Sequence, residues 1–148
     1  MTFKELTAVF VFEAHNFKVL HWMAKGKQFD RVHTKLSSDY YDMVSADADV
    51  VAEYGLRLDE TVPSYPEVLS ILKDSDIQFE VVEGSDFIDY ETFVEKTNHI
   101  LGCILKSLFA VYENEEVKKI ENVGIKSGIE GLIDKYDLEM RFLNKRRI

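Results

Sequence analysis

Helix-breaking residues are scarce in this sequence, and their scarcity limits the possible folds more than any other feature. Among 148 residues there are only seven glycines and two prolines, and both prolines, Pro63 and Pro66, fall in one short segment. Folds built from many short strands need turn residues at regular, short intervals. The sequence therefore predicts a few long helices and all but excludes an all-β fold.

Four long segments carry apolar residues at the spacing of an amphipathic helix. A capping box formed by Thr2 and Glu5 begins the first, and Gly26 stands where a glycine commonly follows a helix end. We predict helices over about 3–25 and 29–59, and over the apolar positions of 90–111 and 125–143.

The long connection between the second and third of these helices contains a shorter one. Ser64 and Glu67 bracket Pro66 in a second capping-box pattern, which predicts a short helix over 66–73. We expect no strand of consequence in 77–83. The chain is thus predicted to be all-α, a single domain over 1–148 with a four-helix bundle of the crossover type.

Charge and cysteine content exclude several classes of protein. The formal net charge of −9 would repel a nucleic acid backbone, so direct DNA binding is not expected. The single Cys103 cannot form an internal disulfide, and the longest apolar runs are interrupted by polar residues such as Lys106 before they could span a membrane. With no leader pattern after Met1, we expect a cytoplasmic protein.

Four residues could bind a metal ion. His21 and His33 flank the turn between the first two helices, and Asp49 and Glu53 stand one helical turn apart further along the second. Imidazole and carboxylate groups are ligands that Fe²⁺ or Mn²⁺ accept. Taken alone the pattern is weak, because acidic pairs are common on solvated helix faces and single histidines usually serve packing.

Helix geometry restricts how these four residues could meet. The sixteen positions from His33 to Asp49 correspond to roughly 24 Å along one helix, beyond the reach of one metal ion. The histidine pair and the carboxylate pair could share a site only if a second subunit packed antiparallel on this helix. Any such site requires a dimer.

The segments HWMAKGKQFDRVH, from 21 to 33, and DVVAE, from 49 to 53, resemble the Dps family of mini-ferritins. The positions that match the family pattern are His21, Trp22, Lys25, Gly26, Phe29 and His33. The resemblance implies a ferritin-like bundle with a short helix in the crossover, assembled as a hollow homododecamer that oxidises Fe²⁺ to Fe³⁺ and stores ferric mineral. Hydrogen peroxide, or else oxygen, would be the oxidant.

The resemblance also implies a role for each site residue. His21 and His33 would bind iron from one subunit, and Asp49 and Glu53 from its two-fold mate. Trp22 would lie beside the iron as an electron donor, although simple packing would explain a lone tryptophan equally well.

One departure from the family bears directly on the site. The family usually places fifteen residues from the second histidine to the aspartate, whereas sixteen are present here. In a regular helix the extra residue changes the angle between the His33 and Asp49 side chains from about 60° to about 160°. Either a π-bulge near 37–41 absorbs it, which we favour because DVVAE keeps its spacing to nearby apolar positions, or the site is disabled. A disabled site would leave a cage-forming or interaction protein of the same fold as the alternative function. Because the first capping box begins at Thr2, we also expect no Lys-rich extension of the kind that DNA-binding family members carry.

Overall fold

The computed structural model describes residues 1–24, 29–84 and 89–146, and helices dominate them. The bundle is formed by α1 (Phe3–Met23), the continuous series α2 (Phe29–Thr34), η1 (Lys35–Tyr41) and α3 (Asp42–Arg57), α5 (Tyr90–Tyr112) and α7 (Val123–Arg146). The shorter elements are α4 (Tyr65–Lys73), α6 (Glu115–Lys118) and η2 (Ile120–Asn122).

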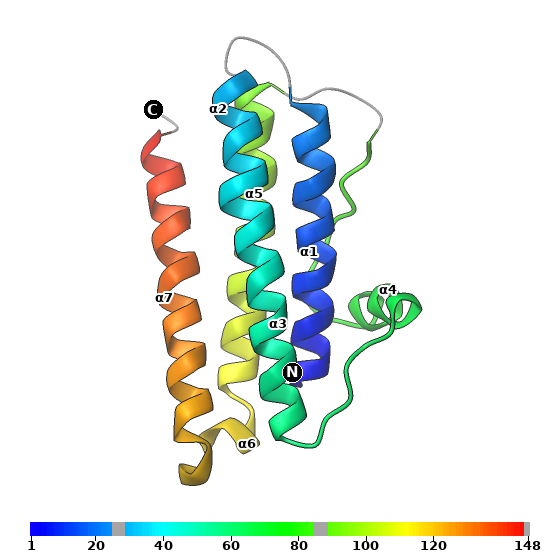
Figure 1. The fold of residues 1–148 in the computed structure, drawn as a ribbon, viewed down its shortest axis with the longest axis vertical. Helices are drawn as coiled ribbons and strands as arrows, with labels where there is room; N and C mark the ends of the chain where they lie inside the picture. The colour runs from blue at the N-terminus through cyan, green and yellow to red at the C-terminus, as the bar shows by residue number, and fades with distance from the viewer. Residues whose placement is uncertain (25–28, 85–88, 147–148) are drawn as a thin grey trace.

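The four long helical segments run side by side, and α4 lies apart from the bundle axis against α1 (Figure 1). Residues 78–83 of the crossover form neither helix nor strand. The predicted all-α crossover bundle is confirmed. Within the described ranges, every helix is too short or too polar to span a membrane.

Local capping explains where the helices begin. Thr2 Oγ1 accepts a hydrogen bond from the Glu5 backbone while the Glu5 carboxylate accepts one from the Thr2 backbone, and Ser64 and Glu67 form the same reciprocal pair at α4. Both predicted capping boxes are present, so the N-cap and N3 backbone N–H groups at each of these helix starts have partners. Gly26, which was predicted to follow the end of the first helix, lies outside the described ranges.

The link between α5 and α7 contains structure that the sequence analysis did not predict. Asn114 caps α6 by accepting a hydrogen bond from the Glu116 backbone, and Val117 is fully buried. A single apolar residue among acidic neighbours carries too little periodicity to predict one helical turn. Here the buried Val117 fixes that turn against the bundle.

The second long helix contains a π-helical segment. Seven residues, Lys35–Tyr41, form η1 between α2 and α3, in the region where a π-bulge was predicted. A π-turn takes up more residues than an α-turn, so it can absorb an inserted residue without ending the helix.

Candidate functional site

The bundle brings the two predicted histidine ligands together. His21 lies in the last turn of α1 and His33 in α2, and their ring centroids are 4.0 Å apart. The Phe29 ring lies 4.9 Å from that of His33. Two imidazoles that are separated by one interhelical turn therefore form a single cluster at one end of the bundle.

The hydrogen bond between these residues fixes the tautomer of His21. Nδ1 of His21 lies 3.3 Å from the backbone oxygen of His33. Because a carbonyl oxygen can only accept, Nδ1 must carry the proton, and Nε2 of a neutral His21 then has a free lone pair. Histidines that bind metals commonly donate their other N–H group to a carbonyl in this way.

Trp22 directly follows His21 in α1 but is not part of the core. Its side chain is 61% exposed. The ammonium of Lys18 lies 6.0 Å from the Trp22 ring and 4.4 Å from the ring of Tyr41. A large aromatic side chain thus remains on the surface one residue after a candidate ligand, with a cation–π contact to Lys18.

The π-helix restores the register of the second long helix. Four residues that follow one another at intervals of four positions are each at most 1% exposed: Val32, Leu36, Tyr40 and Val44. In a regular α-helix each such step advances 40°, so the last of the four would have turned about 120° away from the first. The π-helix η1 therefore keeps the buried side of the second long helix continuous from α2 into α3.

The two carboxylates lie elsewhere in the same chain. Asp49 and Glu53 are exposed on α3, separated from His33 by the continuous series of helical turns through η1. Among the described residues no three His, Cys, Asp or Glu side chains are placed to hold a metal ion. The chain on its own brings together the histidines but not the four predicted ligands.

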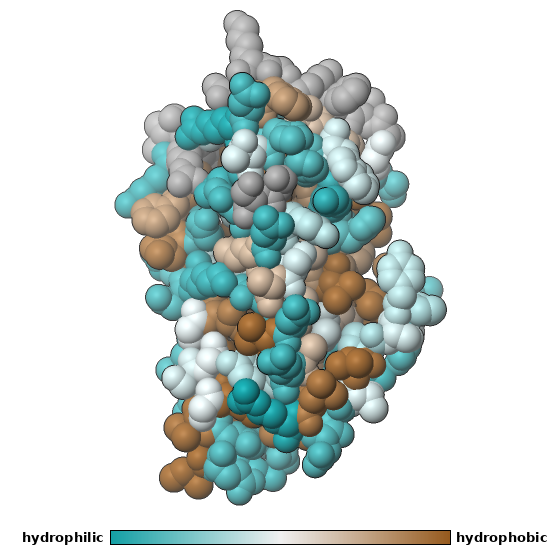
Figure 2. Space-filling model, in the orientation of Figure 1, coloured by the Kyte–Doolittle hydropathy of each residue, from teal (hydrophilic) through white to brown (hydrophobic). Residues whose placement is uncertain are grey.

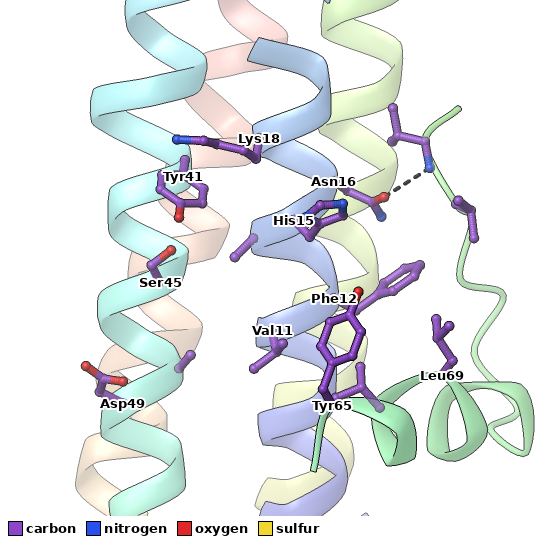
Figure 3. A pocket seen from close by; sticks show the side chains of 15 residues that line it. Val11, Phe12, His15, Asn16, Lys18, Tyr41, Ser45, Asp49, Tyr65 and Leu69 are labelled. Atoms are coloured by element: carbon purple, nitrogen blue, oxygen red, sulfur yellow. Dashed lines mark hydrogen bonds between the residues drawn. The ribbon is translucent and has the colours of Figure 1, made fainter. Parts of the chain in front are cut away.

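A groove of about 560 Å³ adjoins Asp49. Its walls are α1, the segment from Tyr41 to Asp49, α4 and the end of the crossover, and Figure 3 shows the side chains from these elements that line it. Tyr65 and Leu69 of α4, with Val81 of the crossover, are exposed apolar side chains of this groove. Figure 2 shows apolar surface beside α4 on this face of the molecule.

The burial of two carboxylates was not predicted from the sequence. Asp47 accepts hydrogen bonds from Lys135 and Tyr136 of α7, and Glu13 is 1% exposed within α1. Both occupy positions in an apolar helical stripe, which is the one signal that could have revealed them.

The single cysteine has an environment that keeps its thiol protonated. Cys103 is buried, and burial raises the pKa of its thiol to about 12, with the nearby Glu13 carboxyl adding to the rise. A thiol that stays protonated is a poor nucleophile and metal ligand.

A four-helix bundle with a short helix in its long crossover defines the ferritin-like fold, and solved structures share it over nearly the whole chain. A Dps protein from Vibrio cholerae O1, described as a member of a superfamily of ferritin-like diiron-carboxylate proteins, superposes with a TM-score of 0.80 at 20% identity, over 99% of this chain and 86% of that one. Antigen TpF1 from Treponema pallidum gives 0.80 at 18% identity over 97% and 87%, and a Dps protein from Bacillus brevis gives 0.79 at 13% over 99% and 92%.

These likenesses concern structure rather than sequence. No protein-family model matches the chain, and no curated protein has a significantly similar sequence. The chain therefore has the fold of the Dps structures, with the short crossover helix in place as α4.

Proposed function

We propose that this protein is an iron-storing mini-ferritin that oxidises Fe²⁺ at sites shared between two subunits of a hollow dodecamer. His21 and His33 of one subunit, with Asp49 and Glu53 of its two-fold mate, would bind the Fe²⁺ substrate. The observation that carries the proposal is the adjacent histidine pair, whose internal hydrogen bond leaves His21 Nε2 free for a metal.

The groove supports the dimeric arrangement. Its α4 wall presents apolar side chains to solvent, with Tyr65 exposed to 82%. Exposed apolar surface of this kind is typical of faces that are covered by another protein. Since Asp49 lines the same groove, a subunit that covered it antiparallel would bring its histidines toward the carboxylates of the first.

The donor set suits the proposed chemistry. Two imidazoles and two carboxylates bind ferrous iron, and added carboxylate charge favours the ferric product. Two Fe²⁺ ions would each lose one electron to one hydrogen peroxide molecule, which takes up two protons and leaves as two waters. The net charge of −9 per chain, repeated over a closed shell, would attract cations to its interior.

The register of α3 bears on the alternative of a cage with a disabled site. That alternative depended on a regular helix, in which Asp49 would turn away from the shared face. The π-helix and the buried series across it support the oxidising function instead.

Iron oxidation by purified protein tests the proposal. We expect wild type to oxidise Fe²⁺ with stoichiometric peroxide, from an anaerobic start, at least tenfold faster than His21→Ala or Glu53→Ala. Asp76→Ala, an exposed acid of the crossover, is the matched control and should oxidise at the wild-type rate. Equal rates for wild type and the ligand variants would refute the oxidising function.

A mixing experiment tests whether the site is shared. We expect a His21→Ala, His33→Ala variant and an Asp49→Ala, Glu53→Ala variant to be inactive alone. Dissociated and reassembled together, they should regain part of the wild-type rate, because each mixed dimer contains one site with all four ligands. No recovery in mixtures that native mass spectrometry shows to be mixed would contradict the shared site.

The proposed role of Trp22 as an electron donor has its own readout. It is the only tryptophan, so the fluorescence of the protein at long wavelength reports this residue alone. We expect that fluorescence to fall over repeated additions of Fe²⁺ and peroxide, and Trp22→Phe to release more trappable hydroxyl radical. Unchanged fluorescence and equal radical yields would leave Trp22 no role as a donor.

A further inference from the structure

The end of the crossover is fastened to α1 by one side chain. We call residues 78–82 the crossover strap. Nδ2 of Asn16 donates a hydrogen bond to the backbone oxygen of Glu80 at 3.0 Å. The backbone N–H of Val82 donates to Oδ1 of Asn16 at 3.0 Å, and this second bond is the dashed line in Figure 3. Asn16 is 2% exposed, so both bonds are shielded from water. These bonds close the strap over a buried part of α1.

The opposite edge of the strap is fastened to α5. Nε2 of His99 lies 3.1 Å from the backbone oxygen of Gln78, and Sγ of Cys103 donates to the same oxygen at 3.5 Å. The strap is thus held between two helices by side chains, without regular secondary structure of its own. Segments held in this way open with lower free energies than the helices around them.

A carboxyl group lies beneath this fastening. Asn16 Nδ2 also donates to Oε1 of Glu13 at 2.6 Å, whereas Oε2 of Glu13 is buried and has no hydrogen-bond partner among the described residues. An ionised carboxylate has several acceptor positions and pays a large desolvation penalty when one donor alone serves them. The closed strap therefore favours the neutral form of Glu13.

Within the described ranges, none of the groups that shift the pKa of Glu13 is a cation that would offset this penalty. The Glu80 carboxyl approaches from the strap and the Cys103 thiol from α5, while His99 pairs with Glu80 at 3.8 Å and Lys106 lies one turn beyond Cys103. Burial raises the pKa of Glu13 to about 8. The hydrogen bond from Asn16 partly opposes this rise, and the nearby Glu80 carboxyl adds a smaller amount to it.

We propose that the crossover strap is a proton-controlled latch, closed over α1 by Asn16 while Glu13 is neutral and opened by ionisation of Glu13. Opening exposes Glu13 to water, where its carboxylate is solvated and repulsion from Glu80 is relieved. Val81 and Val82 form a wall of the groove, so the latch controls the shape of that face. This inference does not depend on the proposed iron chemistry.

The pH dependence follows from linkage. While the strap is closed, the pKa of Glu13 is about 8, and once the strap is open, that pKa returns to its ordinary value near 4.5. Between these two values the open state binds fewer protons, so its equilibrium constant rises about tenfold per pH unit and becomes level above pH 8. The direction is fixed: alkaline conditions open the strap and acidic conditions close it.

Hydrogen exchange at the Val82 amide tests the latch, because that N–H group is bonded to Asn16. Exchange of the full chain is followed by mass spectrometry from pH 5.5 to 9 and corrected for the intrinsic pH dependence of exchange. We expect the opening constant of wild type to rise about tenfold per unit and then level off, and that of Glu13→Gln to be independent of pH. A flat wild-type profile, or an equal slope in Glu13→Gln, would overturn the proposal.

Three controls keep the outcome specific to the strap. The Ile104 amide in α5 should stay protected, since a parallel rise there would mean global unfolding and would also overturn the latch. Asn16→Ala should exchange faster at Val82 at every pH, and unchanged exchange would show that Asn16 is no anchor. Glu91→Gln, which alters an acid in the first turn of α5, should keep the wild-type profile.

Discussion

The hydroxyl of Tyr136 on α7 donates a 2.7 Å hydrogen bond to Oδ2 of Asp47 on α3. Both residues are buried, and Lys135 adds an ion pair to Asp47 at 2.7 Å from a half-exposed position. Burial and the neighbouring carboxylate raise the pKa of Tyr136 far above its usual range, so the phenol keeps its proton as donor. This bond joins α3 to α7 through a buried polar contact.

Removing that bond should weaken the bundle. Tyr136→Phe leaves Asp47 with a missing donor, and hydrogen bonds to buried charged groups contribute about 2 kcal/mol. We expect the free energy of unfolding in urea, at fixed protein concentration, to fall by about that amount. The control is Tyr112→Phe, whose hydroxyl bonds to Glu130 at the surface and should cost almost nothing. Equal stability of the two variants would show that the buried bond contributes no more than the exposed one.

The Tyr54 side chain of α3 reaches the backbone of α7 at Gly128. A Cβ there would clash with the Tyr54 hydroxyl and lie 2.7 Å from Cζ of that ring, which itself packs edge-on against Phe3. Gly128→Ala should therefore lower the free energy of unfolding by about 1–3 kcal/mol, the usual cost of overpacking.

Another glycine of the same helix provides the control. Gly131 has open space around an added Cβ, so Gly131→Ala should raise the stability by up to about 1 kcal/mol through helix propensity alone. The two substitutions are chemically identical, and opposite signs are expected. A loss of similar size at both positions would contradict the steric explanation.

The attachment of α4 to α1 should fail in acid. The Glu67 carboxylate forms an ion pair with Lys4 at 2.7 Å and accepts a hydrogen bond from the Ser64 backbone N–H. The contact with Lys4, followed by the bonds from Ser64, lowers the pKa of Glu67 to about 2. A depressed pKa stabilises the folded form fully above the ordinary value near 4.5, and that stabilisation is lost as the pH falls through about 2. We expect amide exchange in α4, corrected for its intrinsic rate, to accelerate over this window in wild type. In Glu67→Gln it should show no such change.

Much of the fold could be predicted because its signals are local. Capping by Thr2 and by Ser64 needs only residues three positions away, and the observed helix starts agree with it. The π-helix was predictable for a related reason: the sequence keeps DVVAE in step with nearby apolar residues after the insertion. Whether the helix absorbed the insertion became visible only in the burial of residues on both sides of it.

The buried polar groups could not be predicted in the same way. The partners of Asp47 lie 88 and 89 residues further along the chain, and Asn16 is bonded to groups 64 and 66 residues away. Sequence spacing shows that such a residue falls on an apolar stripe but not which distant donor meets it. The proposed site was hard to predict for a similar reason, because the groups that would complete it around the histidine pair would come from another subunit.

The π-helix offers the sharpest test of how the proposed ligands are arranged. Deleting Ser38 leaves fifteen positions from His33 to Asp49, which a regular α-helix accommodates with Asp49 at the angle that η1 now gives it. We expect this variant to keep its helix content by circular dichroism, its assembly, and an Fe²⁺ oxidation rate within a few-fold of wild type. Deleting Ser37 as well turns α3 by a further 100° or so, and should cost both core packing and oxidation. If the single deletion assembled normally but no longer oxidised iron, η1 would have to shape the site directly, and its role as a passive correction of register would be wrong.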